Sequence, residues 1–385
     1  MTQRLQPVQD LPTRLRAYAA ERVGAARQWA RDYRSRTEDG AIAMHGLIVA
    51  SVLVTFLAFF AGSQWTIVPL AVFLGTMGVG WSRYQAEAAK ALTFLTTVVT
   101  VSILTLIVGF LLYESIPAVR AMGIDLVTQV RNPAMENPTL GQGLWGRNGV
   151  WSLTPMMLGT AITTVIATLI AAPIGIGGAV FVSEIAPRRV REVVKPGIEL
   201  MAGIPSITYG FIGLTILNQY FYAEFGTPTI GTYFAAGLMI GIMALPTVVT
   251  VAEDALNAVP EEIKSGALAM GSTQWQTTKS VTIPAGLSGV SAGVLLGVGR
   301  AMGETMAATV MLTHTKGFPS PFFDVFSRYG ETLTTVIAFE AGNAGGIHLS
   351  ALFAAGVVLF VMVMLLSITS QYVEWRMYRK LGGDQ

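Results

Sequence analysis

Two oppositely charged side chains, Arg300 and Glu304, lie in one of the most apolar stretches of the chain. The stretch that begins at Gly286 is rich in glycine, alanine, valine and leucine, which predicts a membrane-spanning helix. At ~1.5 Å per residue, Arg300 lies ~21 Å along this helix, and Glu304 follows one turn later on the same face. Because a charge at membrane depth is costly, such residues mark a functional site by default.

The chemistry that suits Arg300 is the binding of an oxyanion. Its guanidinium is a planar fork of donors that matches the oxygens of phosphate. Phosphate near neutral pH keeps a proton that it can donate to the carboxylate of Glu304, whereas sulfate has no such proton and meets repulsion. The alternative is a structural salt bridge, in which Arg300 and Glu304 partly neutralise each other and fix this helix against its neighbours.

Small residues recur along the same helix. Gly289, Gly293 and Gly297 are spaced four residues apart, and Gly303 forms a further small pair with Gly299. This spacing favours close packing between membrane helices. A glycine face also leaves room for a ligand beside the arginine.

A long polar segment, over about 253–285, precedes this helix. Pro260 followed by two acids is typical of a helix start, and Gly271 suits the left-handed residue that ends a helix. The pattern predicts a short helix from about Pro260 to Met270. A second short helix then follows, with Pro284 at the entry to the next span.

The composition indicates a polytopic membrane protein, with 52% hydrophobic and 12% charged residues. Since a spanning helix needs about 20 apolar residues, we predict an all-α bundle of eight transmembrane helices. They cover about 42–62, 66–82, 93–113, 153–183, 198–217, 229–252, 286–312 and 349–371. The absence of cysteine excludes disulfides and thiolate sites, and the widely separated His45, His314 and His348 give no metal-ligand spacing.

Positive charge gathers in alternate loops, as is typical of the cytoplasmic side of a membrane protein. Arginine and lysine occur in the segment 1–40, after the second and fourth spans, and in the tail 376–385. All of these fall on one side if every span crosses, so we predict a multi-pass membrane protein with both termini in the cytoplasm. Within the first segment, Leu15–Trp29 is either a basic amphipathic helix on the membrane surface or part of a disordered tail.

The polar segment resembles the Glu-Ala-Ala loop of the permeases of ABC importers. Its second half matches through Ala269-Met270-Gly271 and Ile283-Pro284, but Ser265-Gly266 stand where the family has Glu-Ala, which argues against a charged contact at position 265. In that family the short helix seats in a groove of a separate ATPase. The resemblance assigns this contact to Ser265, Gly266, Ala267, Ala269, Gly271 and Pro284. The alternative is an ordinary surface helix between two spans.

The string Gly-Arg-Ala-Met-Gly-Glu-Thr at 299–305 resembles the phosphate-specific permeases, whereas sulfate and molybdate permeases tend to have Arg-Ala-Leu-Gly-Glu-Phe-Gly. Three further stretches point the same way, and the first favours the C-type subunit: 114–118, 202–210 and 183–187. The resemblance implies a substrate pathway that includes Arg300, Glu304 and Thr305. It also implies three partners: a second permease of the A type, two copies of an ATPase, and an external phosphate-binding protein.

The resemblance divides the chain into four parts. Residues 93–375 form the six-helix permease domain, and the two helices in 41–92 lie outside the family pattern. The segment 1–40 and the tail 376–385 are expected in the cytoplasm. Because no Gly-Lys dipeptide occurs, the chain lacks a phosphate-cradling loop. We therefore predict a transport subunit that is not an enzyme and binds no cofactor, with ATP and magnesium on the partner ATPase.

Three alternatives to a phosphate permease remain at this stage. The first is a permease of the same superfamily for another oxyanion, such as sulfate, molybdate or phosphonate. The second is a secondary transporter or channel that needs no ATPase, which the polar-segment motif argues against. The third is a membrane-embedded enzyme, for which the paired acids Glu253-Asp254 and Glu261-Glu262 are the only candidates, although they resemble helix-end charges beside the polar segment.

Overall fold

The structure is a computed structural model that describes residues 28, 38–136, 140–319 and 321–380. All regular secondary structure in these residues is helical, which confirms the all-α prediction. The chain forms two compact units, Met1–Leu106 and Ile107–Gln385, with their boundary inside one long helix. The helix considered for Leu15–Trp29 lies almost entirely outside the described residues.

The first unit is a helical hairpin followed by the first part of a long helix. Its elements are α3 (Asp39–Phe60), the 3₁₀ turn η1 (Gln64–Thr66), α4 (Ile67–Arg83) and the start of α5 (Gln85–Met122). Gly62 turns the chain with a φ of +64°, and the Ser63 side chain accepts the N–H of Trp65. Met44, Ile48 and Ala88 form the small core of this unit.

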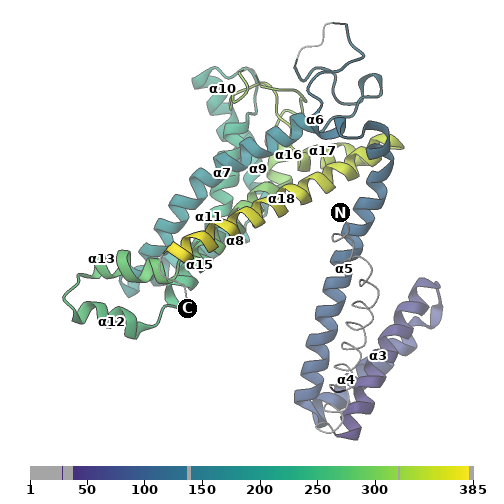
Figure 1. The fold of residues 1–385 in the computed structure, drawn as a ribbon, viewed down its shortest axis with the longest axis vertical. Coiled ribbons are helices and arrows are strands. Elements are labelled where there is room, and N and C mark those ends of the chain that lie inside the picture. Colours follow the sequence, from purple (N-terminus) through teal and green to yellow (C-terminus); the bar gives the residue numbers. More distant parts are fainter. Residues whose placement is uncertain (1–27, 29–37, 137–139, 320, 381–385) are drawn as a thin grey trace, which may run out of the picture. The chain divides into compact units, whose positions relative to one another are not determined.

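The second unit contains the remaining helices, which Figure 1 shows as a bundle with short helices at both ends. They are α6 (Asp125–Thr128), η2 (Arg147–Gly149), α7 (Thr154–Val180), η3 (Phe181–Ile185), α8 (Arg188–Gly203), α9 (Ser206–Ile212), η4 (Gly213–Asn218), α10 (Gln219–Phe225), α11 (Tyr233–Asn257), α12 (Glu261–Ala269), α13 (Gln274–Thr277), η5 (Thr278–Thr282), α14 (Ile283–Ala285), α15 (Leu287–Gly303), α16 (Met306–Met311), α17 (Leu333–Glu340), η6 (Ala341–Asn343) and α18 (Ile347–Lys380). Of the short segments, η3, η4 and η5 are π-helical.

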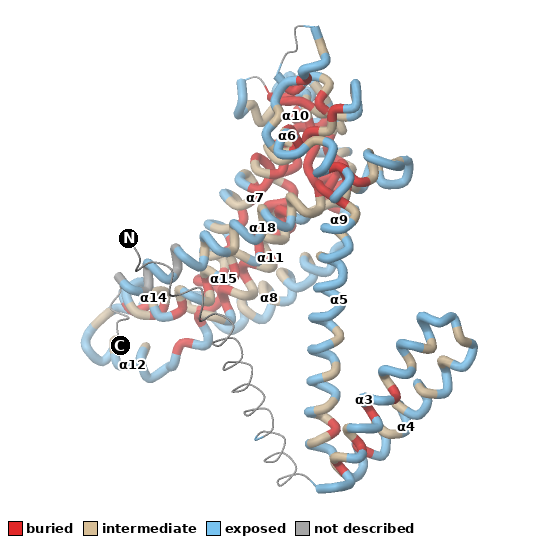
Figure 2. Tube along the Cα trace, turned by 45° about the vertical axis from the view of Figure 1, so that its right-hand side comes forward, coloured by how far each residue is buried: buried red, intermediate tan, exposed pale blue. Residues whose placement is uncertain are grey.

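Helix α11 is the centre of the second unit and packs between α7 and α15. Its most apolar stretch is 61% buried, against 33% for the span formed by α7 and η3. Glycines allow the close approach, because a Cβ at Gly237 would lie 2.7 Å from Cβ of Ile166 and one at Gly175 would lie 2.6 Å from Cγ1 of Val248. Figure 2 shows the buried residues concentrated in this bundle and beside α6 and α10.

Among the described residues, six helices are long and apolar enough to cross a membrane, or up to eight if each of two bent pairs is one span. This range includes the predicted eight, and α4, the shortest predicted span, is among the six. The third span is longer than expected, because α5 covers Gln85–Met122 and so extends beyond both ends of the predicted span 93–113.

The predicted fifth span, 198–217, is wrong in its position. The helix α8 carries the arginines of the preceding loop and buries no residue, and the chain then bends by 90° before the helical stretch Ser206–Phe225. The bend has a local cause, because Pro205 disfavours helical geometry at Ile204, whose φ and ψ are −68° and 127°.

The predicted seventh span, 286–312, is wrong in its continuity. Its helix α15 ends at Gly303, and Glu304 adopts extended backbone angles of −66° and 123° before α16 begins. At its other end, α15 is bent by 71° from the helical stretch Gln274–Ala285. The span is therefore a helix of 17 residues with a break at each end.

Candidate functional site

Arg300 lies near the C-terminal end of α15 and faces α11. Its Nη1 donates a hydrogen bond of 3.0 Å to Oγ1 of Thr247. A guanidinium has five N–H donors, and no other acceptor for them is found in the part of the chain that the structure describes. The side chain is partly exposed. Arg300 therefore retains a fork of donors that can bind an anion.

Glu304 does not pair with Arg300, which contradicts the alternative of a structural salt bridge and the expected placement of Glu304 one helical turn beyond Arg300. Its Oε1 accepts the backbone N–H of Ala307 at 3.0 Å, and its carbonyl oxygen accepts the hydroxyl of Thr334 at 2.9 Å. No ion pair joins Glu304 to any described residue. The break after Gly303 takes the carboxylate out of the helical register in which residues four apart meet.

Thr305 is the third residue of the predicted pathway and lies at the start of α16. Its Oγ1 donates to the carbonyl of Gly303 at 3.1 Å, and its own carbonyl accepts the N–H of Thr309 at 2.8 Å. Arg300, Glu304 and Thr305 thus lie along one junction, between the end of α15 and the first turn of α16.

The glycines of α15 that recur every four residues face α11. A Cβ at Gly289 would lie 2.3 Å from Cβ of Ala255, and one at Gly297 would lie 2.4 Å from Cγ2 of Val248. Gly293 is similarly close, at 3.2 Å from the backbone nitrogen of Ala252. In contrast, a Cβ at Gly303 would meet none of the described atoms within 4 Å. The close approach therefore involves the first three glycines of the predicted set.

The helix-turn-helix prediction for the polar segment is confirmed. Helix α12 runs over Glu261–Ala269, and Gly271 has a φ of +90°, as expected of the residue that turns the chain. Thr273 then caps the start of α13, because its hydroxyl accepts the backbone N–H of Gln276 and its own backbone N–H donates to Oε1 of Gln276. Pro284 lies in α14, directly before α15.

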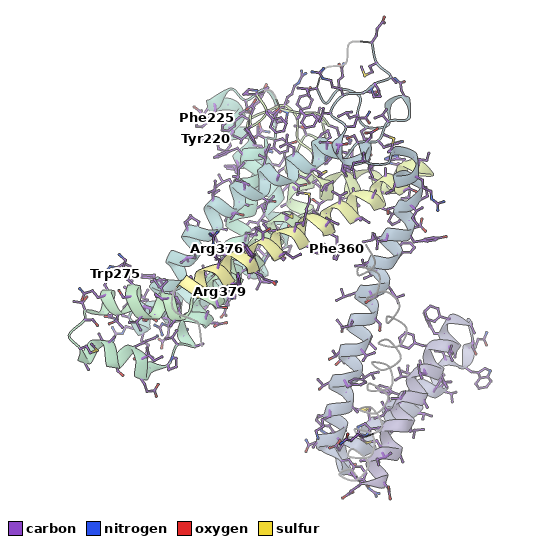
Figure 3. All side chains as sticks on the ribbon, viewed as in Figure 1. Tyr220, Phe225, Trp275, Phe360, Arg376 and Arg379 are labelled. Carbon is purple, nitrogen blue, oxygen red and sulfur yellow. The ribbon has the colours of Figure 1, made fainter. Side chains whose placement is uncertain are left out.

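This hairpin presents apolar side chains on an open surface. Helix α12 buries no residue, and Ser265, Gly266 and Ala269 are exposed. Four large apolar side chains are exposed as well: Ile263, Leu268, Met270 and Trp275. Figure 3 shows Trp275 at this end of the second unit, whereas Tyr220 and Phe225 lie on α10 at the other end. An exposed apolar surface of this kind is typical of a docking site.

One ion pair at the base of the hairpin could not be found from the sequence. Lys264 of α12 lies 2.8 Å from Oε1 of Glu184 in η3, and both side chains are largely buried. The two residues are 80 positions apart. The only signal was that Glu184 belongs to the stretch 183–187 that resembles phosphate permeases.

A second charged cluster lies at the opposite end of this unit. Glu331 is 1% exposed, and its carboxylate lies 3.3 Å from Nδ1 of His314 and 3.6 Å from Nζ of Lys316. Lys316 also pairs with Glu340, which binds Nε2 of His348 at 2.7 Å. The sequence placed these histidines far apart, but folding brings both into one network. Within the described residues no group of three or more acidic or histidine side chains could hold a metal ion.

Two groups in this cluster have pKa values that differ from their ordinary values. A hydrogen bond with Glu331 raises the pKa of His314 above its ordinary value, although burial of the ring acts in the opposite direction. Burial alone would raise the pKa of Glu340. Hydrogen bonds with Lys316, Trp145 and His348 outweigh it and hold that pKa below its ordinary value.

Comparison with known proteins gives relatives that are permease subunits. A probable ABC transporter permease protein of Bacillus subtilis is 35% identical over 257 residues, which cover 66% of this chain and 78% of that protein. The phosphate transport system permease protein PstC of Mesorhizobium japonicum is 34% identical and covers 58% of this chain and 74% of that protein. A probable PstC of Methanocaldococcus jannaschii is 31% identical and covers 78% and 98%, respectively.

Solved structures of ABC transporters are also similar. A chain of a bacterial alginate ABC transporter, solved in complex with a pentasaccharide-bound periplasmic protein, has a TM-score of 0.48 and 13% identity, and covers 77% of this chain and 97% of that chain. A chain of the MetNI methionine ABC transporter in an inward-facing conformation has a TM-score of 0.46 and 18% identity, covering 57% and 94%.

The family assignment follows from a match to a whole-family sequence model. The model of the binding-protein-dependent transport system inner membrane component matches residues 171–379, which is more than half of the 385 residues. The matched region includes the hairpin α12–α13 and the junction of α15 and α16. This chain therefore belongs to the family of binding-protein-dependent transport system inner membrane components.

Proposed function

We propose that this chain is a permease subunit of an ATP-driven phosphate importer and forms part of the translocation pathway. The observation that carries the proposal is Arg300, a guanidinium in a candidate span that makes one hydrogen bond to the described residues and keeps its other donors for an anion. The relative in Mesorhizobium japonicum is a phosphate transport system permease protein, and the one in Methanocaldococcus jannaschii is a probable one. Together these observations support phosphate as the transported oxyanion.

Glu304 gives the pathway its selectivity for a protonated anion. One carboxylate oxygen accepts the N–H of Ala307, while the other has no hydrogen-bond donor among the described residues and can accept a proton from phosphate. Sulfate offers no such proton near neutral pH. Thr305, at the same junction, adds a hydroxyl to the path.

The hairpin α12–α13 docks on a separate ATPase, where ATP and magnesium bind. Its exposed apolar side chains support a protein partner, and its short α12 suits a helix-in-groove contact. The coupling residues in this proposal are Ser265, Gly266, Ala267, Ala269, Gly271 and Pro284. This chain itself is not an enzyme and binds no cofactor.

The remaining partners are a second permease of the A type, which pairs with this C-type subunit, and an external phosphate-binding protein. The complex spans the bacterial inner membrane, with both termini and the hairpin α12–α13 in the cytoplasm. The distribution of arginine and lysine between the loops supports this orientation. The cluster around Glu331 then lies on the outer side.

The proposal is tested by ATP-dependent uptake of radiolabelled phosphate into proteoliposomes that contain the complete complex and the phosphate-binding protein. Excess unlabelled phosphate should block uptake, and excess sulfate should leave it unchanged. Equal inhibition by both anions would instead indicate a permease for oxyanions in general. Uptake that continues without the ATPase subunits would contradict the ATP-driven mechanism.

A further inference from the structure

Glu184 lies in η3, the π-helical segment that ends the span begun by α7. The N–H of Ala186 donates to the carbonyl of Phe181 at 2.7 Å, a bond between residues five apart that defines this wider turn. Such π-helical turns replace regular helix at a cost and occur often at functional sites. The turn directs Glu184 toward the hairpin α12–α13.

Both arms of the hairpin are attached to Glu184. Lys264 of α12 lies 2.8 Å from its Oε1, and Nε2 of Gln274 at the start of α13 donates to its carbonyl at 2.8 Å. The side chains of Lys264 and Glu184 are only 13% and 9% exposed, so water and salt screen this ion pair weakly. Helix α12 buries no residue, and among the described residues this is the one ion pair that joins α12 to η3.

The same π-helical turn is also hydrogen-bonded to two further helices, α11 and α8. Ser183 donates to Oδ1 of Asn257 at the end of α11 at 3.0 Å, and its carbonyl accepts Nη2 of Arg191 in α8 at 2.6 Å. Asn257 and Lys195 of α8 both donate to Oε1 of Glu253, which is 3% exposed. Hydrogen bonds therefore join η3 to α8 and α11, and the chain itself continues from α7 into η3.

We propose that the Glu184–Lys264 ion pair is the link through which ATPase-driven movement of the hairpin α12–α13 reaches the membrane-spanning helices. The inference rests on the proposed function, because it assumes that a separate ATPase moves this hairpin. Glu184 and Lys264 act as positioning residues, since neither contacts the transported anion or ATP. Removal of either charge leaves the other largely buried and unpaired.

The test uses the complete complex in proteoliposomes and measures the number of phosphate ions transported for each ATP hydrolysed. Glu184→Gln and Lys264→Met should each lower this ratio at least fivefold, while the ATPase still co-purifies at the wild-type level. The exchange Glu184→Lys with Lys264→Glu should restore the ratio to within twofold of wild type. Lys264→Arg keeps the charge and should keep the ratio.

The matched control is the ion pair Arg188–Glu192, which has the same 2.8 Å separation but lies exposed on α8, at 92% and 60% exposure. Arg188→Gln and Glu192→Gln should leave the ratio unchanged. An unchanged ratio in Glu184→Gln and Lys264→Met would overturn the inference, and so would an assembled charge-exchange variant that stays as uncoupled as the single variants. Failure of the wild-type complex to transport phosphate would instead contradict the proposed function.

A second measurement does not depend on transport. The chain has no cysteine, so spin labels can be attached at Glu261→Cys in α12 and Ile174→Cys in α7 alone. When the reconstituted complex binds ATP, the distance between the labels should stay constant, because the ion pair makes the two helices move together. In Glu184→Gln the distance should change or broaden on ATP binding. A distance that responds to ATP equally with and without the ion pair would overturn the inference.

Discussion

Arg300 is expected to bind the anion through its fork of donors rather than through charge alone. Arg300→Lys keeps the charge but loses bidentate geometry, so phosphate uptake should fall at least tenfold while the complex still assembles. Arg300→Ala should abolish uptake. Glu304→Gln should retain more uptake than Arg300→Ala, because the amide oxygen can still cap Ala307, and sulfate should begin to compete. Uptake assays on purified complexes of equal composition measure each effect.

A charge exchange separates this role from a structural one. Because Arg300 bonds Thr247 and Glu304 bonds Ala307, the two side chains occupy different surroundings. Arg300→Glu combined with Glu304→Arg should therefore not transport phosphate. Normal phosphate transport by that double variant would exclude the binding role of Arg300.

The pKa of His314 should make the stability of the protein depend on pH near neutrality. Its hydrogen bond with Glu331 raises the folded-state pKa, so the protonated ring stabilises the fold. This contribution is complete below the unfolded pKa of about 6.5 and is lost as pH rises through the folded pKa. Unfolding temperatures measured from about pH 6 to pH 9 should fall for the wild type and fall less for His314→Gln.

Glu340 provides the matched comparison, because its pKa shifts in the opposite direction. Its lowered folded pKa gives stability that is complete above the unfolded pKa of about 4.3 and is lost as pH falls through the folded value. Glu340→Gln should therefore change how the unfolding temperature depends on pH on the acid side of the range. A His314→Gln profile that matches the wild type from about pH 6 to pH 9 would contradict the assignment.

At the level of single residues, the sequence indicated where unusual side chains lie, but it did not indicate which partners they contact. Arg300 was identifiable because a charge in an apolar stretch is conspicuous. The sequence did not show that Glu304 leaves the helix that carries Arg300. Gly303-Glu304-Thr305 contains no proline, so a continuous helix was the default expectation. Contacts from distant segments stabilise the break, including the Thr334 hydroxyl on the carbonyl of Glu304.

Among the elements, the turn between α12 and α13 depends on the backbone of Gly271. Its φ of +90° is costly for any residue with a Cβ, roughly 1–2 kcal/mol, although the space around it is open. Gly271→Asp should lower both ATPase co-purification and transport-stimulated ATP hydrolysis severalfold. Gly197→Ala, at an equally open position inside α8, should leave both unchanged. If Gly271→Asp behaves like Gly197→Ala, the hairpin is only a connector.

The packing of α15 on α11 should be sensitive to one glycine and insensitive to its neighbour. A Cβ at Gly297 would lie 2.4 Å from Cγ2 of Val248, whereas one at Gly299 would meet no described atom within 4 Å. Gly297→Leu should destabilise the protein by about 1–3 kcal/mol through overpacking, and Gly299→Ala should not. Thermal unfolding in detergent measures the difference. Equal unfolding temperatures for both variants would show that α15 does not need this close approach.

Helix existence was predictable and helix ends were not. The apolar stretches of about 20 residues predicted α3, α4, α7, α11 and α18, because length and hydropathy decide whether a segment can cross a bilayer. The displaced fifth span shows the limit. The apolar run near residue 198 continues the amphipathic α8, and the proline at 205 decides where the next helix starts. The π-helical turns have no sequence signal, since they depend on tertiary contacts such as those of Glu184.

For the whole molecule, the division into two units bears on the role of the N-terminal helices. The small core of the first unit joins Met44 and Ile48 of α3 to Ala88 of α5, with partly buried neighbours no further along the chain than Leu95. The family match begins at residue 171, inside the second unit. The core of that unit uses residues from Ala118 onward. Among the described residues, the cluster of the first unit is thus formed by side chains of that unit.

Because the family match lies in the second unit, we expect that a chain starting near residue 86 still inserts and transports phosphate at a rate within about twofold of the full-length protein. Its α5 would remain as the first span, since that helix begins at Gln85 and no residue of its most apolar stretch is buried even with α3 and α4 present. No charged residue of the predicted pathway is removed. The measurement is phosphate uptake by complexes that contain equal amounts of full-length or truncated chain. Because lipid can replace the lost helices against α5, the expected cost is confined to the Met44–Ala88 contact. Complete loss of uptake by a truncated chain that is expressed and assembled normally would show that α3 and α4 belong to the translocation unit.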